Sequence, residues 1–329
     1  MINFFDVIVD LQQGDSGKGK ISSHLSKTGG YTHCVRFNGS NNAGHTIYND
    51  GKKIVTHSIP TGVIHGVKSI IGPGCVVNIE HFFNELDELR KSGVDTYGKV
   101  FIASNAHIIT DDHLSEDGED TKIGTTRRGN GPAYRDKYDR IGVRASEVPE
   151  LRSYLIDMYD EFYGRQECNI LLEGAQGFYL DIDWGDYPYV TSSHCTVGSA
   201  IMNGVPPQKI RKVYGAAKIY ETYVGTKKFE PDDQVFSRIR DLGAEFGATT
   251  GRPRQCNWLT VENLVKATRI NGVTDLVISK MDVLRSLRTW CVYYGGRKLT
   301  FFSEGGIKDF ISTHFPDVTI HWSDNPEGL

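Results

Sequence analysis

The sequence predicts an α/β fold with a mainly parallel central sheet, helices on both faces and small insertions in the connecting loops. Apolar, β-branched segments alternate along the chain with segments whose apolar residues recur at helical spacing. Residues 4–9 and 169–173 are apolar enough to be buried strands, and each is followed by a glycine-rich turn. The 329 residues show no repeat or linker, so we expect a single domain, 1–329, with insertions.

The predicted elements follow one another in order. Strands are predicted at residues 4–9, 32–37, 69–72, 100–102, 169–173, 212–219, 275–279, 289–293 and 318–322. Helices are predicted from residue 21 and at residues 79–91, 151–163, 261–270 and 307–314. Residues 46–48 and 52–55 flank Asn49-Asp50-Gly51, which predicts a hairpin. Residues 127–144 are rich in charge and glycine without a clear period, so we expect an ordered functional loop or short helices there.

Composition argues against several classes of protein. With 41 acidic and 37 basic residues, the net charge of −4 argues against a surface made for nucleic acid. The six cysteines are scattered, which favours buried free thiols in a reducing compartment. No apolar run is long enough to cross a membrane, and the N-terminus has no signal-peptide pattern. We therefore expect a soluble, cytoplasmic enzyme.

A glycine-rich turn follows the first predicted strand and reads Gly14-Asp15-Ser16-Gly17-Lys18-Gly19-Lys20. Such a turn before a helix N-terminus suits phosphate binding, because free backbone N–H groups point at the anion. The turn matches the P-loop pattern, but Ile21 stands where Ser or Thr would ligate Mg²⁺. Asp15, inside the turn, could hold the metal or take a proton instead. For the turn alone, the alternative is a tight connection that binds nothing.

Two further loops carry groups suited to a ligand. Asn42-Ala43-Gly44-His45-Thr46 combines an amide, a glycine that permits close approach and a histidine that titrates near neutral pH. Gly124-Thr125-Thr126-Arg127-Arg128-Gly129-Asn130-Gly131-Pro132 offers the hydroxyl, backbone and guanidinium donors that phosphate recognition uses. The alternatives are a surface or capping histidine and a solvated basic turn.

Three motifs in the second half of the chain complete the set. Gly174-Ala175-Gln176-Gly177 follows a buried strand, where α/β sheets usually bind ligands, and the segment 187–193 adds hydroxyl groups. Thr249-Thr250-Gly251-Arg252-Pro253-Arg254 sets two guanidiniums on one side of an extended segment, which suits a dicarboxylate or a polyphosphate. Ser279-Lys280-Met281-Asp282 is similar to the N-K-x-D with which GTPases hold guanine.

Together, and in this order, these motifs resemble those of the adenylosuccinate synthetase family over nearly the whole chain. The resemblance implies a ligase that joins L-aspartate to C6 of IMP while it hydrolyses GTP. The residue types agree with that chemistry. A lactam oxygen is a poor leaving group, so it must be phosphorylated before an amine can displace it, and removal of N1–H makes O6 nucleophilic.

The resemblance also implies roles for individual residues. The implied catalytic residues are Asp15 as the base at purine N1, His45 as the acid that assists O6, and Lys18 as a phosphate binder. The implied residues for the nucleoside triphosphate are Gly14, Ser16, Gly17, Lys18, Gly19, Lys20, Thr46, Arg254, Lys280 and Asp282. Those for the purine monophosphate are Asp15, Ser16, Asn42, Ala43, Gly44, His45, Thr125, Thr126, Arg140, Gln176, Thr191 and Arg252. Those for aspartate are Thr249, Thr250, Gly251, Arg252 and Arg254.

A cofactor and a partner are implied in the same way. The resemblance implies Mg²⁺, held by the Asp15 carboxylate and the Gly44 carbonyl. It also implies a homodimer in which Arg140 reaches the nucleotide phosphate in the partner subunit's site. The expected partners are thus three small-molecule substrates and a second copy of the chain, with no nucleic acid and no membrane.

Several positions depart from the family pattern. Ser16 replaces the Glu of Gly-Asp-Glu-Gly-Lys-Gly-Lys, Gln13 replaces the usual Trp, and Asp10-Leu11 stands where small or apolar residues are common. The segment Ser323-Asp324-Asn325-Pro326 replaces the Ser-Thr-Gly-Pro that helps to enclose the guanine of GTP.

The short side chain of Ser16 would leave more room beside the purine. We therefore expect dGMP as the substrate, with ATP or dATP, as in the phage-type branch that makes 2-aminoadenylosuccinate and acts in a host cytoplasm. The alternatives are an ordinary enzyme for IMP and GTP, a GTP-hydrolysing switch built on residues 14–20 and 280–282, and an inactive binding module.

Overall fold

The computed structural model describes residues 1–329 except 50, 120–123, 165, 248–250 and 325–329. Its centre is a nine-stranded sheet whose paired strands all run parallel, in the order β17-β14-β11-β1-β10-β2-β5-β7-β9. The strands are β1 (Ile2–Asp10), β2 (His33–Arg36), β5 (Lys68–Ile71), β7 (Val100–Ala103), β9 (Leu155–Ile156), β10 (Cys168–Glu173), β11 (Ile210–Lys218), β14 (Asp275–Ser279) and β17 (Thr319–Ser323). The predicted α/β class is confirmed.

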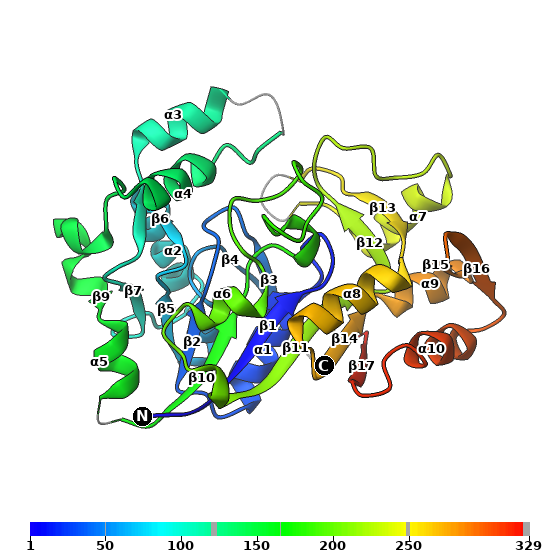
Figure 1. The fold of residues 1–329 in the computed structure, drawn as a ribbon, viewed down its shortest axis with the longest axis horizontal. Coiled ribbons are helices and arrows are strands. Elements are labelled where there is room, and N and C mark those ends of the chain that lie inside the picture. The colour runs from blue at the N-terminus through cyan, green and yellow to red at the C-terminus, as the bar shows by residue number, and fades with distance from the viewer. Residues whose placement is uncertain (50, 120–123, 165, 248–250, 325–329) are drawn as a thin grey trace.

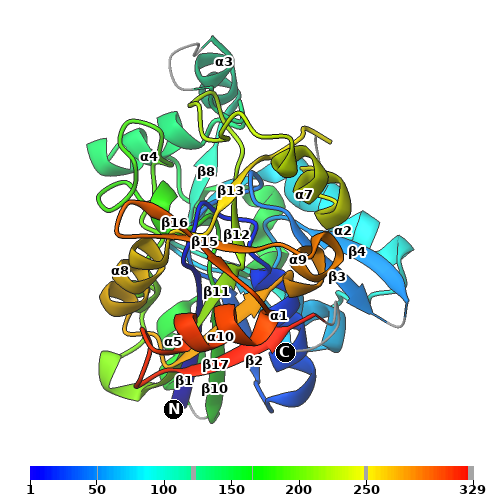
Figure 2. The same ribbon diagram turned by 90° about the vertical axis from the view of Figure 1, so that its right-hand side faces the viewer.

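Helices cover both faces of this sheet. In Figures 1 and 2, α8 (Val261–Asn271) and α6 (Val197–Ile201) lie on one face, while α1 (Lys18–Thr28) and α2 (Ile79–Lys91) lie on the other. The central strand β1 is therefore buried on both sides. Val7 and Val9 belong to the main hydrophobic cluster, whereas Ile8 packs with Ile21 and Leu25 of α1 in a second cluster.

Smaller elements are inserted between the strands of the main sheet. The predicted hairpin is confirmed as the antiparallel pair β3 (His45–Asn49) and β4 (Lys52–Thr56). Two more antiparallel pairs are β12 (Tyr220–Tyr223) with β13 (Gln255–Trp258), and β15 (Trp290–Tyr294) with β16 (Arg297–Phe301). A short parallel pair joins β6 (Val76–Asn78) to β8 (His107–Ile109). The other helices are α3 (Asp111–Glu119), α4 (Asn130–Asp139), α5 (Met158–Tyr163), α7 (Val235–Gly243), α9 (Met281–Leu287) and α10 (Glu304–Ser312).

One predicted helix is wrong over half of its length. Residues 149–154 form a 3₁₀ helix and residues 155–156 pair with β7 as β9, so only the end of the predicted segment 151–163 is α-helical, as α5. Tyr154 explains the break, because its ring packs edge-on against Phe82 and Phe83 of α2 and ties this segment to the edge of the sheet. The charge-rich segment 127–144 contains the short helix α4.

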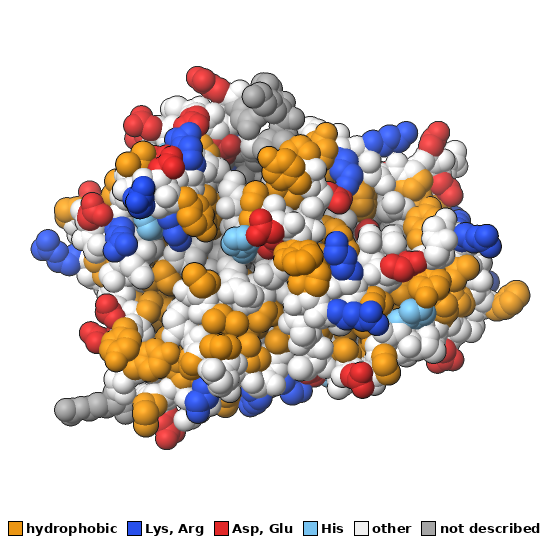
Figure 3. Space-filling view, viewed as in Figure 1, with side chains coloured by type: hydrophobic (Ala, Val, Ile, Leu, Met, Phe, Trp, Pro, Cys, Tyr) orange, Lys and Arg blue, Asp and Glu red, His pale blue; other side chains and the backbone are white. Residues whose placement is uncertain are grey.

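The surface carries charges of both signs, as the nearly balanced numbers of acidic and basic residues suggest. Side chains of both charge signs are interspersed with apolar ones on the face that carries α6 and α8 (Figure 3). In the part of the chain that is described, no helix has the length and apolarity needed to span a membrane. All six cysteines are buried and unpaired, as predicted.

Candidate active site

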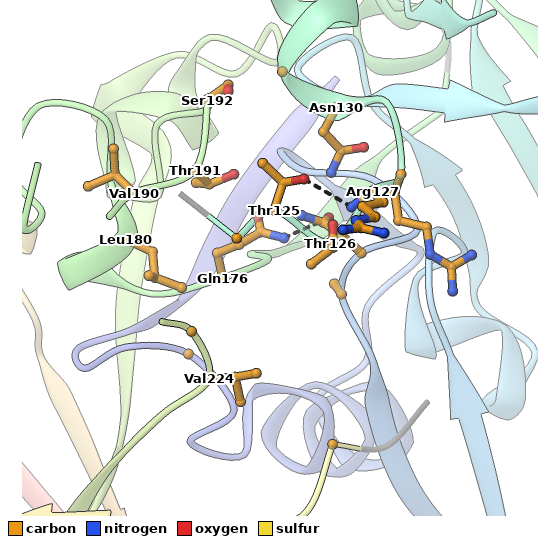
Figure 4. Close-up of a pocket in the computed structure, with 18 of the residues that line it drawn as sticks. Thr125, Thr126, Arg127, Asn130, Gln176, Leu180, Val190, Thr191, Ser192 and Val224 are labelled. Atoms are coloured by element: carbon orange, nitrogen blue, oxygen red, sulfur yellow. Dashed lines mark hydrogen bonds between the residues drawn. The ribbon is translucent and has the colours of Figure 1, made fainter. Parts of the chain in front are cut away.

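A cavity of about 870 Å³ lies at the carboxyl ends of the central strands (Figure 4). Helices α3 and α4 lie on one side of it, and the ends of β12 and β13 lie on the other; Figure 1 shows these elements. The predicted site residues that line it are Gly14, Asp15, Lys18, Asn42, Ala43, Gly44, His45, Thr125, Thr126, Gln176, Thr191, Arg252 and Arg254. They come from segments far apart in the sequence, so it is the parallel order of the strands that gathers them at one edge.

The loop between β1 and α1 forms one wall of the cavity. Gly14, Asp15 and Gly17 have positive φ angles of 88°, 57° and 104°, and left-handed backbone of this kind favours glycine. Gly17 is the N-cap of α1, and Lys18 is the first residue of the helix. The unpaired N–H groups and the positive dipole end of α1 therefore face an anion-binding position.

The Ser16 side chain turns away from the cavity. Ser16 does not line it and is 2% exposed, and its hydroxyl lies 3.0 Å from Oδ1 of Asp10 and 3.1 Å from Oε1 of Gln12. A short side chain here therefore adds no space beside a ligand. The expectation that Ser16 enlarges a purine pocket has no support in this geometry.

Arg254 connects Asp15 to a buried network of charges. Nη2 of Arg254 lies 2.9 Å from Oδ2 of Asp15, and its Nη1 lies 2.7 Å from Oε2 of Glu245. Lys218 places its ammonium 2.7 Å from the same Glu245 oxygen. Burial opposes ionisation of Glu245, but Lys218 and Arg254 outweigh it and lower its pKa to about 2. The network holds a guanidinium permanently beside Asp15.

Asp15 and Gly44 fit the Mg²⁺ ion that the resemblance implies. Both residues line the cavity, and both hydrogen-bonding contacts of Arg254 with Asp15 are made to Oδ2. The other carboxylate oxygen and the Gly44 carbonyl are oxygen donors of the hard type that Mg²⁺ prefers.

His45 lines the cavity, and a buried glutamate, Glu173, contacts its imidazole ring. Its Nδ1 lies 2.6 Å from Oε1 of Glu173, and Nη2 of Arg36 lies 2.7 Å from that same oxygen. Burial and then the Arg36 charge lower the pKa of His45 to about 4. Burial would raise the pKa of Glu173, but Arg36 and His45 hold it well below its usual range. The site without substrate therefore pairs an ionised Glu173 with a neutral imidazole.

Neighbouring residues fix this pair in place. Oε2 of Glu173 accepts hydrogen bonds from the backbone N–H of Thr61 at 3.0 Å and from its hydroxyl at 2.7 Å. A Cβ at Gly19 would lie 2.7 Å from Cβ of His45, so a glycine is needed where α1 passes β3. Gly19, predicted as a phosphate-loop residue, thus also makes room for the histidine.

Polar side chains gather on one part of the cavity wall. Figure 4 shows Thr125, Thr126, Gln176 and Thr191 around a common space, and Nε2 of Gln176 donates to Oδ1 of Asn42 at 2.9 Å. The apolar side chains of Leu180, Val190 and Val224 lie along the left and lower parts of the same view (Figure 4). A ligand with a polar, anionic end and a flat apolar body would match both parts.

A second group of predicted residues lies near the ends of β14 and β17, outside the cavity lining. Nζ of Lys20 lies 2.7 Å from Oγ of Ser323, the last residue of β17. Burial, and then the positive charge of Lys280, lower the pKa of Lys20 to about 8, while Asp324 and Asp282 act in the opposite direction. Lys20, Lys280 and Asp282 are therefore neighbours, at a location separate from the cavity.

The remaining predicted residues do not line the cavity. These are Gly17, Gly19, Thr46, Arg140 and Gly251, while Thr249 and Thr250 lie outside the described residues. Arg140 ends α4 in a left-handed conformation with φ of 65°. Close to it in the chain, the apolar side chains of Tyr138 and Ile141 and the acidic side chain of Asp139 are exposed.

Several residues at the site were not among the predicted site residues, and Glu173, Gln13 and Asn130 are three of them. Glu173 is the only charged residue of a predicted strand that is otherwise apolar or amide, and that contrast was its signal in the sequence. Gln13 and Asn130 line the cavity, and in the structure Oε1 of Gln13 and both amide atoms of Asn130 are buried without a hydrogen-bond partner. From the sequence, Asn130 is named only as part of the loop 124–132 and Gln13 only as a departure from the family pattern, and neither amide is given a role.

Comparison with known proteins identifies the family. A family model described as adenylosuccinate synthetase matches residues 7–162 and 148–302. The chain belongs to the adenylosuccinate synthetase family. It is similar to the adenylosuccinate synthetases of Acidothermus cellulolyticus, at 39% identity over 84% of the chain and 77% of the relative, and of Halothermothrix orenii, at 36% over 98% and 89%. The chain is therefore a ligase of the adenylosuccinate synthetase type. The cavity described above is its candidate active site.

Solved structures share the fold. The structure of fully ligated adenylosuccinate synthetase from Plasmodium falciparum has a TM-score of 0.86 at 27% identity, covering 98% of each chain. The succinoaminodeoxyadenylate synthetase of cyanophage S-2L, bound to dGMP and dATP, has a TM-score of 0.79 at 23% identity, covering 99% of this chain and 94% of that one. At 23% identity, the similarity to the cyanophage enzyme shows a shared fold and nothing more.

Proposed function

We propose that the protein joins the amino group of L-aspartate to C6 of IMP, with GTP as the phosphate donor. The observation that carries this proposal is the meeting of Asp15, Lys18 and His45 at one cavity, together with hydroxyl and amide side chains suited to a nucleotide phosphate. Membership of the adenylosuccinate synthetase family supports it, because the similar enzymes named above bear that name at 36–39% identity.

The residues suit a reaction in two steps. Asp15 takes the proton from N1, which makes O6 nucleophilic; O6 then attacks the γ-phosphorus of GTP, and GDP leaves. The amine of aspartate next attacks C6 and loses a proton, and the C6–O6 bond breaks, so that O6 leaves within the released phosphate. Lys18 and the N-terminus of α1 stabilise the negative charge of the transferring group. Arg252 and Arg254, which both line the cavity, provide cations for the carboxylates of aspartate.

His45 assists O6 from the neutral state that burial and the Arg36 charge favour. An oxyanion next to the imidazole raises its proton affinity, since a nearby negative charge favours the protonated form. Mg²⁺, held by Asp15 and Gly44, would supply further positive charge for the phosphoryl group. Burial and the Arg36 charge lower the pKa of His45, and the oxyanion acts in the opposite direction.

A second candidate substrate is dGMP, with ATP or dATP as the donor. IMP and GMP share the O6/N1–H lactam and differ by a 2-amino group, which needs a hydrogen-bond acceptor. Oε1 of Gln13 is such an acceptor, since it is buried and unpartnered beside Asp15. Gln13, rather than Ser16, is therefore the residue on which this candidate depends.

Arg140 supports a homodimer with shared sites. The residue does not line the cavity of its own chain, and like the nearby Tyr138 and Ile141 it is exposed. A second copy docked on this surface would receive the guanidinium at its nucleotide phosphate.

A matrix of substrates tests the proposal. Phosphate release is measured with IMP, GMP or dGMP against GTP, ATP or dATP, each with and without aspartate. We expect the fastest aspartate-dependent release with IMP and GTP. Turnover confined to dGMP with ATP or dATP would establish the second candidate instead. Triphosphate hydrolysis that needs neither purine monophosphate nor aspartate would point to a switch protein.

A further inference from the structure

Asp10, at the carboxyl end of the central strand β1, fixes the backbone of the loop that follows it. Its side chain is buried, with the residue only 1% exposed. Oδ1 accepts the backbone N–H of Gln12 at 3.0 Å, and Oδ2 accepts that of Ser16 at 2.9 Å. The carboxylate therefore ties down both the start and the middle of the turn between β1 and α1.

The same carboxylate holds Lys18. Oδ2 of Asp10 lies 3.1 Å from Nζ of Lys18, and the carbonyl of Gln176 accepts a second bond from that ammonium at 2.5 Å. An ammonium has three protons, so these two contacts leave one for a ligand in the cavity that Lys18 lines. Asp10 and Gln176 thus determine the direction of the remaining donor.

Asp10 also joins two loops of the site. A Cβ on Gly177 would lie 3.0 Å from Oδ1 of Asp10 and 2.3 Å from the backbone nitrogen of Gly14, so the two turns are in close contact. The hydroxyl of Ser16 adds a fourth donor to the carboxylate, at 3.0 Å. A charge buried this deeply is expensive unless donors surround it, and here each oxygen has two.

We propose that Asp10 is a positioning residue for phosphoryl transfer, which holds the Lys18 ammonium and the loop amides where the transferring phosphate passes. The inference rests on the proposed ligase function. Asp10 does not line the cavity, so it acts through Lys18 rather than on the substrate. Charge on the phosphoryl oxygens matters most in the transition state, so loss of Asp10 reduces kcat more than substrate binding.

The test replaces Asp10 by Asn and compares it with a matched control on the same strand. Asp6, in the middle of β1, is also fully buried and accepts from Arg211 Nε at 3.1 Å and from the Lys212 backbone at 3.0 Å. For Asp10→Asn we expect kcat to fall by about thirtyfold or more, with KM for each nucleotide changed less than about threefold. Asp6→Asn is expected to lower the melting temperature while kcat stays within about twofold.

A second measurement does not depend on turnover. Because an amide side chain cannot accept from all four donors, hydrogen exchange at the backbone N–H of Gln12 or Ser16 should be at least about tenfold faster in Asp10→Asn than in the parent and in Asp6→Asn. Unchanged exchange at both positions, or equal losses of kcat in the two variants, would overturn the proposal. A parent protein without ligase turnover would defeat the proposed function, while the exchange rates would still decide the role of Asp10.

Discussion

Oε1 of Glu173 lies 2.6 Å from Nδ1 of His45, at the point where the buried strand β10 meets the cavity. Arg36 contacts the same oxygen, so the carboxylate stays ionised and the imidazole keeps one orientation. The pairing explains why a glutamate ends an otherwise apolar or amide strand. Glu173 is therefore the buried residue that sets the orientation of the His45 imidazole.

Glu173→Gln is therefore predicted to lower kcat by about a hundredfold, because the imidazole loses the anion that fixes its tautomer. It should also destabilise the protein by about 3 kcal/mol, since Arg36 is left buried without its counter-charge. Activity is measured per folded molecule, after circular dichroism has shown how much is folded.

A second Glu–His pair supplies the control. Glu161 of α5 lies 2.7 Å from His33, at the opposite edge of the sheet from the cavity. Glu161→Gln should lower stability while kcat stays near that of the parent. A Glu173→Gln variant with parental kcat would show that His45 needs no anionic partner.

Asp15→Asn is predicted to abolish ligase turnover, by a factor of at least about a hundred, while nucleoside triphosphate binding measured by calorimetry persists. The amide keeps the shape of the side chain but cannot take the N1 proton. Asp186→Asn is the control, since Asp186 is an exposed acid paired with Lys227. Near-parental rates for Asp15→Asn would mean that another residue is the base.

The pH dependence of the free energy of unfolding should show the raised pKa of Glu85. Burial raises its pKa to about 7 from an ordinary 4.5, although it accepts the backbone N–H groups of His57, Ser58 and Ile59. Between these two values the folded protein binds more protons than the unfolded chain. Its free energy of unfolding therefore falls as pH rises through this window, by up to about 3 kcal/mol from this one group.

Urea denaturation of the parent and of Glu85→Gln measures this effect. Glutamine does not titrate, so the stability of the parent relative to the variant should decline between pH 4.5 and about 8, while all other groups cancel. A difference that stays constant with pH would show that Glu85 ionises with its ordinary pKa.

Arg140→Leu should raise KM for the purine monophosphate if Arg140 serves the site of a second subunit. Mixing Arg140→Leu with Asp15→Asn gives the sharper test, because a mixed dimer contains one site with both native residues. Random exchange should then restore about a quarter of parental activity at low substrate. No recovery on mixing, together with an unchanged KM in Arg140→Leu, would exclude a shared site.

The fold was predictable because its strands have a strong local signature. Buried parallel strands such as β1 and β10 are apolar on both faces, and glycine-rich turns mark their carboxyl ends. The helix predicted at residues 151–163 was wrong over its first half because Tyr154 packs on Phe82 and Phe83. Contacts between residues so far apart in the chain cannot be read from local spacing. Packing of this kind overrides local helical spacing.

The site was predictable where a motif carries the chemistry, as at Asp15 and His45. It was not predictable where side chains meet only in the fold. Ser16 was expected beside the purine, yet its hydroxyl turns to Asp10, a residue known from the sequence only as a departure from the family pattern. Whether a loop side chain faces a ligand or its own backbone depends on φ angles, here the positive ones at Gly14 and Asp15.

The most direct test follows the oxygen atom. The central claim is that the cavity transfers phosphate to O6 of a purine monophosphate before aspartate displaces it. IMP labelled with heavy oxygen at O6 is incubated with GTP, Mg²⁺ and aspartate, and the released phosphate is analysed by mass spectrometry. We predict that the label appears in the phosphate in proportion to the product formed. Phosphate without label, at full product formation, would contradict the proposed reaction.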